Sequence, residues 1–176
     1  MAAASGTNEA GELPHRIRDY RDGDAAAVLA LNAAHVPEVS TMSSEQLAYF
    51  ASSAPYFKVV VSDEEITGML IGMTDAEKNY ESTNYGWFLA RRDSFAYVDR
   101  IALSESVRGL RLGPELYADF ANWAREHEKE FLCAEVNIVP PNPRSMRFHR
   151  LSGFAEVGRR KPYGPDEEVA MLERAL

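Results

Sequence analysis

Residues 107–113, with the sequence Val-Arg-Gly-Leu-Arg-Leu-Gly, constrain the fold of this chain more than any other stretch. They follow residues 95–103, where side chains alternate in the two-residue period of a strand. They precede residues 112–128, where apolar residues recur at helical spacing. The sequence therefore predicts a strand, a glycine turn and a helix in direct succession.

Such a turn suits a bound phosphate. Backbone N–H groups at a helix start have no intrahelical partner, and the helix dipole favours an anion there. Gly109 and Gly113 allow close approach of backbone and ligand, and Arg108 and Arg111 carry guanidinium groups that match phosphate oxygens. The alternative is a glycine turn that binds nothing.

The composition of the chain limits the classes of protein to which it can belong. The 176 residues are 45% hydrophobic, which suits one domain with a core and excludes a disordered chain. No apolar run approaches the ~20 residues of a membrane span. Residues 1–12 read as a flexible tail rather than a signal peptide, followed by a single domain over residues 13–176. The single cysteine, Cys133, excludes an internal disulfide and a cysteine metal cluster; it fits the cytoplasm, and we expect no metal.

The charge is unevenly distributed. The net charge of −8 argues against nucleic-acid binding. Residues 1–99 contain 15 acidic and 7 basic residues, whereas residues 100–176 contain 12 of each. An anionic ligand would therefore favour the second half, where six basic residues and one acid lie between 144 and 161, and a cationic ligand the first. The alternative is an uneven solvated surface.

The periodicity predicts a mixed sheet covered by helices on both faces. One face of strand 95–103 would carry Phe95, Tyr97, Asp99, Ile101 and Leu103, and residues 75–93 would form a long loop, often a functional feature. We expect strands at 15–21, 56–62, 65–73, 95–103, 131–139, 154–159 and 168–173, and helices at 25–34, 43–52, 112–128 and 143–151.

A second motif follows the glycine turn after about thirty residues. Residues 142–154 read Asn-Pro-Arg-Ser-Met-Arg-Phe-His-Arg-Leu-Ser-Gly-Phe. Together the two motifs resemble those of the GNAT acetyltransferase superfamily, and the resemblance covers roughly residues 15–175. It implies that the chain is a small, bacterial-type, single-domain member of this superfamily, with a fold of the α/β (α+β) class. Its mixed, mostly antiparallel sheet would have six to seven strands, splayed between the central strands, with helices on both faces.

The resemblance also implies a site for acetyl-CoA. Backbone amides of the turn would hold the pyrophosphate, and the preceding strand end would pair with the pantetheine arm, near an asparagine and a serine of the second motif. The residues so implied are Arg108, Gly109, Leu110, Arg111, Leu112, Gly113, Ile101, Ala102, Leu103, Asn142 and Ser145.

Two positions depart from the family pattern. Arg111 stands where the family has a glycine, so the turn must accept a side chain, which is straightforward if φ stays negative. Arg111 would then either reach the phosphates or point to solvent. His149 stands where the family has a tyrosine that protonates or positions the departing thiolate. The imidazole could supply that proton; the alternative is a helix-surface histidine without this role.

Two carboxylates are candidates for the chemistry. Asp99 and Glu135 each lie in a strand between apolar neighbours, where burial raises a carboxyl pKa. We prefer Glu135 as the base that deprotonates an amine and Asp99 as an anchor for the substrate; either residue could instead form an ion pair. The resemblance places the end of the first helix at the acceptor site, so Asn32, His35 and Glu38 are candidate substrate contacts. The aromatic residues of 75–93 would either line its mouth or pack on themselves.

The resulting hypothesis is an N-acetyltransferase in which a primary amine, on a small molecule or a peptide, directly attacks acetyl-CoA in a ternary complex. No cysteine stands where a covalent acetyl-enzyme would need one. The alternatives are a non-catalytic CoA-binding or regulatory module of the same fold and a protein-interaction domain without a ligand. Nucleic acid and membrane are not expected as partners, and family members often form homodimers.

Overall fold

A computed structural model describes residues 15–176. The tail predicted over residues 1–12 lies outside the described residues. The strands are β1 (His15–Asp19), β2 (Tyr56–Ser62), β3 (Glu65–Thr74), β4 (Phe95–Leu103), β5 (Phe131–Val139), β6 (Ala155–Arg160) and β7 (Glu168–Ala175). The helices are α1 (Ala25–Ala33), α2 (Ser44–Ser53), α3 (Thr83–Leu89), α4 (Leu112–Glu126) and α5 (Pro143–Leu151), with short 3-10 turns at Asp22–Asp24 and Glu105–Val107.

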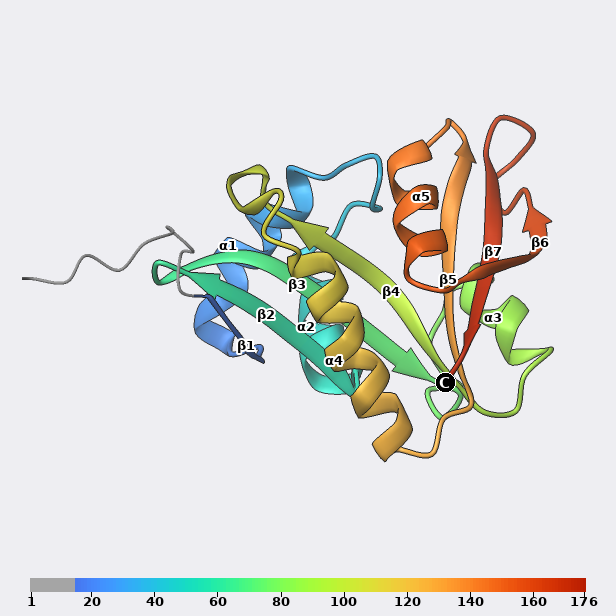
Figure 1. The fold of residues 1–176 in the computed structure, drawn as a ribbon, viewed down its shortest axis with the longest axis horizontal. Coiled ribbons are helices and arrows are strands. Elements are labelled where there is room, and N and C mark those ends of the chain that lie inside the picture. Colours follow the sequence, from blue (N-terminus) through green and yellow to red (C-terminus); the bar gives the residue numbers. More distant parts are fainter. Residues whose placement is uncertain (1–14) are drawn as a thin grey trace, which may run out of the picture.

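One sheet contains all seven strands in the order β1-β2-β3-β4-β5-β7-β6 (Figure 1). Every neighbouring pair is antiparallel except β4 and β5, which run parallel. These two strands pair only from Phe95–Phe131 to Tyr97–Cys133 and then diverge, as Figure 1 shows. The predicted mixed, splayed sheet is confirmed.

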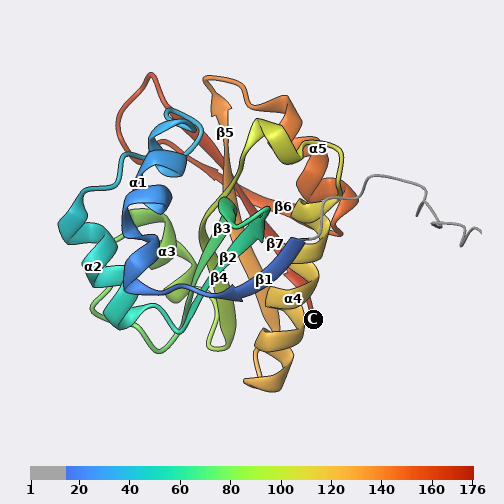
Figure 2. The same ribbon diagram turned by 90° about the vertical axis from the view of Figure 1, so that its left-hand side faces the viewer.

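Helices cover both faces of the sheet. Figure 2 shows α1, α2 and α3 on one side and α4 and α5 on the other. Each layer has its own apolar core: Val28, Phe50 and Phe88 lie in the first, and Leu116 and Phe120 in the second. No helix within residues 15–176 combines the length and the apolar character needed to cross a membrane.

Side-chain caps define two of the helix starts. Ser43 and Gln46 form a reciprocal capping box at α2, as the sequence predicts. Asn142 caps α5: its side-chain oxygen accepts from the backbone N–H of Ser145 at 3.1 Å. Pro143 occupies the first position of α5, where a missing N–H costs nothing.

The prediction of an uninterrupted loop over residues 75–93 is wrong, because α3 lies inside it. The Ser82 side chain caps this helix by accepting from the N–H of Tyr85 at 3.3 Å. Tyr85 and Phe88, three residues apart, are buried against the sheet. Aromatic residues are weak helix formers, so tertiary packing rather than propensity stabilises α3.

The predicted face pattern of β4 is correct only up to Val98. Gly72 pairs with Val98 and Ile71 with Arg100, which leaves Asp99 as the extra residue of a β-bulge. Side chains beyond the bulge therefore change face. Tyr97 packs in the α1–α3 layer, whereas Ile101, predicted on the same face, contacts the α4–α5 layer.

Gly72 is needed for the contact between β3 and α4. A Cβ added there would lie 2.5 Å from two ring atoms of Phe120. We expect Gly72→Ala to lower the free energy of unfolding by about 1–3 kcal/mol, because the fully buried ring must shift. Gly23, which has open space around it, provides the control: Gly23→Ala should stay within about 0.5 kcal/mol. Urea denaturation measures both, and equal values would contradict this packing.

Candidate active site

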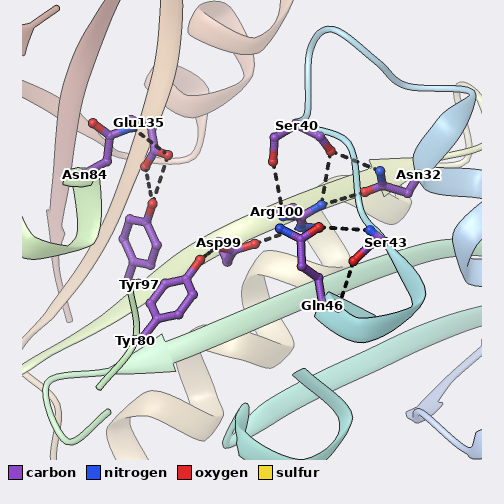
Figure 3. A network of polar contacts seen from close by, with 10 residues as sticks. All are labelled: Asn32, Ser40, Ser43, Gln46, Tyr80, Asn84, Tyr97, Asp99, Arg100 and Glu135. Carbon is purple, nitrogen blue, oxygen red and sulfur yellow. Dashed lines mark hydrogen bonds and ion pairs between the residues drawn. The ribbon is translucent and has the colours of Figure 1, made fainter. Parts of the chain in front are cut away.

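Glu135 lies on β5 just beyond the point where β4 and β5 separate. The hydroxyl of Tyr97 donates to its carboxylate, at 2.8 Å from Oε1 and 2.7 Å from Oε2. The side-chain amide of Asn84, in the first turn of α3, donates to Oε1 at 3.2 Å. Figure 3 shows these two groups converging on the carboxylate.

Burial governs the acidity of this carboxyl. It raises the pKa of Glu135 from 4.5 to about 7; the hydrogen bonds from Tyr97 and Asn84 act in the opposite direction, and the charge of Asp99 raises it further. The pKa of Tyr97 is raised well above its ordinary value, chiefly by burial, so this hydroxyl keeps its proton. Glu135 is therefore partly ionised near neutral pH, as a general base requires.

The same shift makes stability depend on pH. The folded protein holds a proton on Glu135 up to a pKa of about 7, whereas the unfolded chain releases it near 4.5, so stability falls as pH rises through this window. We expect Glu135→Gln to be more stable than wild type by about 1–3 kcal/mol at pH 8, with little difference at pH 5. Urea denaturation at both pH values checks this, and a difference independent of pH would contradict it.

Asp99 forms the ion pair that the sequence left open. Its Oδ2 lies 2.7 Å from Nε of Arg100, and both side chains are only 6% exposed. The hydroxyl of Tyr80 donates to its other oxygen, Oδ1. With both oxygens bonded inside the protein, Asp99 stabilises the bulge, and its role as a substrate anchor stays a prediction.

Arg100 also connects β4 to the segment between α1 and α2 (Figure 3). It donates to Oδ1 of Asn32 at 2.8 Å and to the carbonyl of Ser40 at 3.2 Å. Asn32 in turn donates to the same carbonyl at 3.0 Å and is 1% exposed. The side chain of Asn32 is thus buried and hydrogen-bonded to other residues of the protein.

The other two candidate substrate contacts differ from each other. His35 places Nδ1 2.8 Å from the carbonyl of Leu31 and Nε2 2.8 Å from the carbonyl of Leu103, so its ring bridges α1 and the end of β4. Glu38 is exposed. Contact of these residues with an acceptor stays a prediction; of the three, Glu38 alone is exposed.

His149 belongs to α5 and contacts Tyr117 of α4. It is 3% exposed and therefore is not a helix-surface residue. Its Nδ1 lies 2.8 Å from the carbonyl of Ser145, so Nδ1 carries the proton and Nε2 accepts from the hydroxyl of Tyr117, also at 2.8 Å. Burial lowers the pKa of His149, which favours the neutral ring. The acid role of His149 stays a prediction that this arrangement does not favour, because its only N–H is occupied.

The glycine turn exposes main-chain donors ahead of α4. Gly109 has a φ of 88° and Arg111 a φ of 60°, so the turn accepts the Arg111 side chain in the left-handed region and not at the negative φ named as the condition for it. Within residues 15–176, the N–H groups of Gly109, Arg111, Leu112 and Gly113 find no acceptor, whereas those of positions 108 and 110 bond to carbonyls of the preceding turn. Four free donors at a helix start fit a diphosphate.

The separation of β4 and β5 lies between the glycine turn and Glu135 in the order of β4 and β5 residues. Beyond Tyr97 no described residue of β5 pairs with β4, so the edge of β4 toward Ile101, Ala102 and Leu103 faces the splay without a strand partner. Asn142 caps α5, which follows β5, and Ser145 lies in the first turn of this helix. That a ligand held by the turn continues along β4 toward Glu135 stays a prediction.

Sequence reasoning missed the partners of Glu135. Tyr97 and Asn84 are 38 and 51 residues away from it in the chain. The parallel register of Tyr97 with Cys133 places this tyrosine near Glu135, and that signal requires the strand pairing. Of the aromatic residues in positions 75–93, Tyr85 and Phe88 belong to the hydrophobic core. They do not line the mouth of an acceptor site.

The comparisons with known proteins agree with this geometry. A sequence model described as the acetyltransferase (GNAT) family matches residues 25–154. The chain belongs to the GNAT acetyltransferase family. This confirms the resemblance, and it makes the protein a member of a family of acetyl-CoA-dependent enzymes. A search of curated proteins found no match to this GNAT chain.

Solved structures share the fold of this GNAT protein at low sequence identity. Ard1 from Thermoplasma volcanium is 17% identical with a TM-score of 0.75, and covers 92% of this chain and 97% of its own. The ribosomal-protein-S18-alanine N-acetyltransferase from Escherichia coli is 14% identical with a TM-score of 0.70, with 92% and 94% covered. A chain of the NatC complex bound to Gag peptide and CoA is 14% identical with a TM-score of 0.73, with 92% and 98% covered.

Proposed function

We propose that this protein transfers the acetyl group of acetyl-CoA to a primary amine by direct attack, with Glu135 as general base. The observation that carries the proposal is the buried carboxylate of Glu135 just beyond the last β4–β5 pair, where burial raises its pKa to about 7. Free amides of the turn at positions 109 and 111–113 support a diphosphate bound ahead of α4.

The residues meet the demands of the reaction in turn. An amine with an ordinary pKa near ~10 arrives as ammonium and must lose a proton before it can attack. Glu135 takes this proton, and its hydrogen bonds from Tyr97 and Asn84 hold the carboxylate in place. Acetyl-CoA supplies a thioester carbonyl: the amine nitrogen bonds to that carbon and releases its second proton to solvent, the carbon–sulfur bond breaks, and the thiolate leaves.

The thiolate does not need an acid from the protein. A thiol with a pKa near ~8.5 is a good leaving group and takes its proton from solvent once it is free. This agrees with His149, whose single N–H bonds to the carbonyl of Ser145. Protonation by His149 stays the alternative, and it requires that bond to break.

We propose a cationic acceptor, on a peptide N-terminus or a small molecule. The excess of acidic residues in positions 1–99 supports this choice. The names of two proteins of the same fold point to protein or peptide acceptors, an S18 alanine acetyltransferase and a complex with a Gag peptide. The non-catalytic CoA-binding module stays the second candidate, favoured by the occupied N–H of His149.

A thiol-release assay tests the proposal. The protein is given acetyl-CoA and a panel of peptides with different N-terminal residues, polyamines, amino sugars and lysine, with Glu135→Gln as the negative control. We expect thiol release with at least one amine and loss of that release in the variant. Tight binding of acetyl-CoA without release across the panel would favour the non-catalytic module.

A further inference from the structure

We infer that Arg160, at the end of β6, is a positioning residue for the base. By bonding to the amide oxygen of Asn84, it turns the amide NH2 group of Asn84 toward Glu135 and so favours the ionised carboxylate. This inference rests on the proposed role of Glu135 and adds to it a residue on a different strand, on the far side of α3.

The contacts form a chain of three side chains. Arg160 Nη1 donates to Oδ1 of Asn84 at 3.2 Å and also to the backbone carbonyl of Thr83. Nδ2 of Asn84 donates to Oε1 of Glu135 at 3.2 Å. Asn84 is only 4% exposed, so its amide has few other partners. The orientation of this amide is therefore set at one end by Arg160 and at the other by Glu135.

The hydrogen-bonding chemistry of the three groups determines which way the side-chain amide of Asn84 points. A guanidinium can only donate, so the amide of Asn84 must present its oxygen to Arg160. The NH2 group then faces Glu135, and an ionised carboxylate, which can only accept, is the form that it stabilises. Without Arg160 the amide can turn and offer its oxygen to a protonated Glu135. Arg160 thus favours the form of Glu135 that is able to take a proton.

The position of α3 does not depend on Arg160 alone. A Cβ added at Gly158 of β6 would lie 2.9 Å from the ring of Trp87, which shows how closely α3 packs on this strand. Tyr85 and Phe88 hold the other side of α3 in the core. Removal of the guanidinium should therefore release the amide of Asn84 while α3 stays in place.

The same arginine belongs to the basic stretch between 144 and 161 that the sequence associated with an anionic ligand. Its neighbour Arg159 is exposed and pairs with Glu156 at 2.6 Å. Arg160 instead contacts α3. The two adjacent arginines thus provide a matched pair for experiment, one with the contact to Asn84 and one without it.

The experiment is a carboxyl-carbon NMR titration of Glu135, assigned with Glu135→Gln, which needs no acceptor. We expect a midpoint near 7 in wild type, an upward shift of about half a unit to one unit in Arg160→Met, a smaller shift in Arg160→Lys, and none in Arg159→Met. Asn84→Ala should also raise the midpoint, and Arg160→Met should add little in that background.

Each outcome bears on the inference. An unchanged midpoint in Arg160→Met, or an equal shift with and without Asn84, would overturn it, the latter by showing a direct charge effect. Should Arg160→Met fail to fold, the wild-type protein still decides: the side-chain amide resonances of Asn84 must titrate with the midpoint of Glu135, and constant resonances would overturn the inference.

The two proposals fail separately. If the midpoints shift as described but Glu135→Gln keeps full transferase activity, the role of Glu135 as base is wrong and the positioning by Arg160 stands. With an accepted amine, Arg160→Met should raise the acid limb of the kcat/KM profile by the same shift and leave the KM for acetyl-CoA unchanged. A merely structural role would not move that limb.

Discussion

Glu135→Gln is expected to lower kcat by about 10²- to 10⁴-fold, the range that a positioned general base contributes. The amide has nearly the same shape and still accepts from the hydroxyl of Tyr97, but it cannot take a proton from the amine. The acid limb of the pH–rate profile, expected near the pKa of about 7 of Glu135, should vanish with the carboxylate. Thiol release with an accepted amine measures both effects.

Measurement of acetyl-CoA binding distinguishes an effect on the chemical step from an effect on the cofactor site. Glu135 lies at the splay rather than at the glycine turn, so the Kd for acetyl-CoA should change by less than about threefold in Glu135→Gln, which is under 1 kcal/mol. Glu156→Gln is the control, because Glu156 is exposed on β6 and bonds only to Arg159 among the described residues. A Glu135→Gln enzyme that keeps a tenth or more of the wild-type kcat would require another base.

Two substitutions of Arg111 separate the main chain of the turn from the guanidinium. Arg111→Gly keeps the left-handed φ of 60° and the free N–H and loses only the side chain. Arg111→Pro also removes the N–H and forces φ to about −65°, which the turn cannot accommodate. We expect the Kd for acetyl-CoA to rise by less than about tenfold in Arg111→Gly and by at least ~100-fold in Arg111→Pro.

Calorimetry with acetyl-CoA measures these values, and thermal unfolding checks that both variants fold. Arg111→Gly should be as stable as wild type to within about 1 kcal/mol, because relief of the left-handed backbone offsets the added freedom of glycine in the unfolded chain. Equal losses of affinity in the two variants would assign the binding to the guanidinium and contradict a grip by the main chain.

Local patterns predicted most of the fold. The bounds of β2, β4, β5 and α5 agree with the periodicity and the prolines around them, since those signals are contained in a few neighbouring residues. The bulge at Asp99 could not be predicted from neighbouring residues, because it arises from the register of β4 against β3. Helix α3 was missed because tertiary burial of Tyr85 and Phe88 outweighs a weak local propensity.

The site was predictable only in part. Position between apolar residues predicts both Glu135 and Asp99 as candidates; we prefer Glu135 as base, but the sequence leaves an ion pair open for either residue. The contacts separate them: Asp99 is paired with Arg100, whereas the side-chain partners of Glu135 among residues 15–176 are the neutral donors Tyr97 and Asn84. Arg100 adjoins Asp99 in the chain, but the partners of Glu135 come from positions 38 and 51 residues away, and no periodicity indicates them.

The central claim is that the free amides before α4 hold the diphosphate of acetyl-CoA. A ¹⁵N–¹H correlation spectrum recorded with acetyl-CoA, and separately with inorganic pyrophosphate, tests it most directly. We expect downfield movement with both ligands of the amide signals of Gly109, Arg111, Leu112 and Gly113, because each N–H gains an anionic acceptor. Signals that stay in place at these four positions while others in the spectrum respond to acetyl-CoA would contradict it.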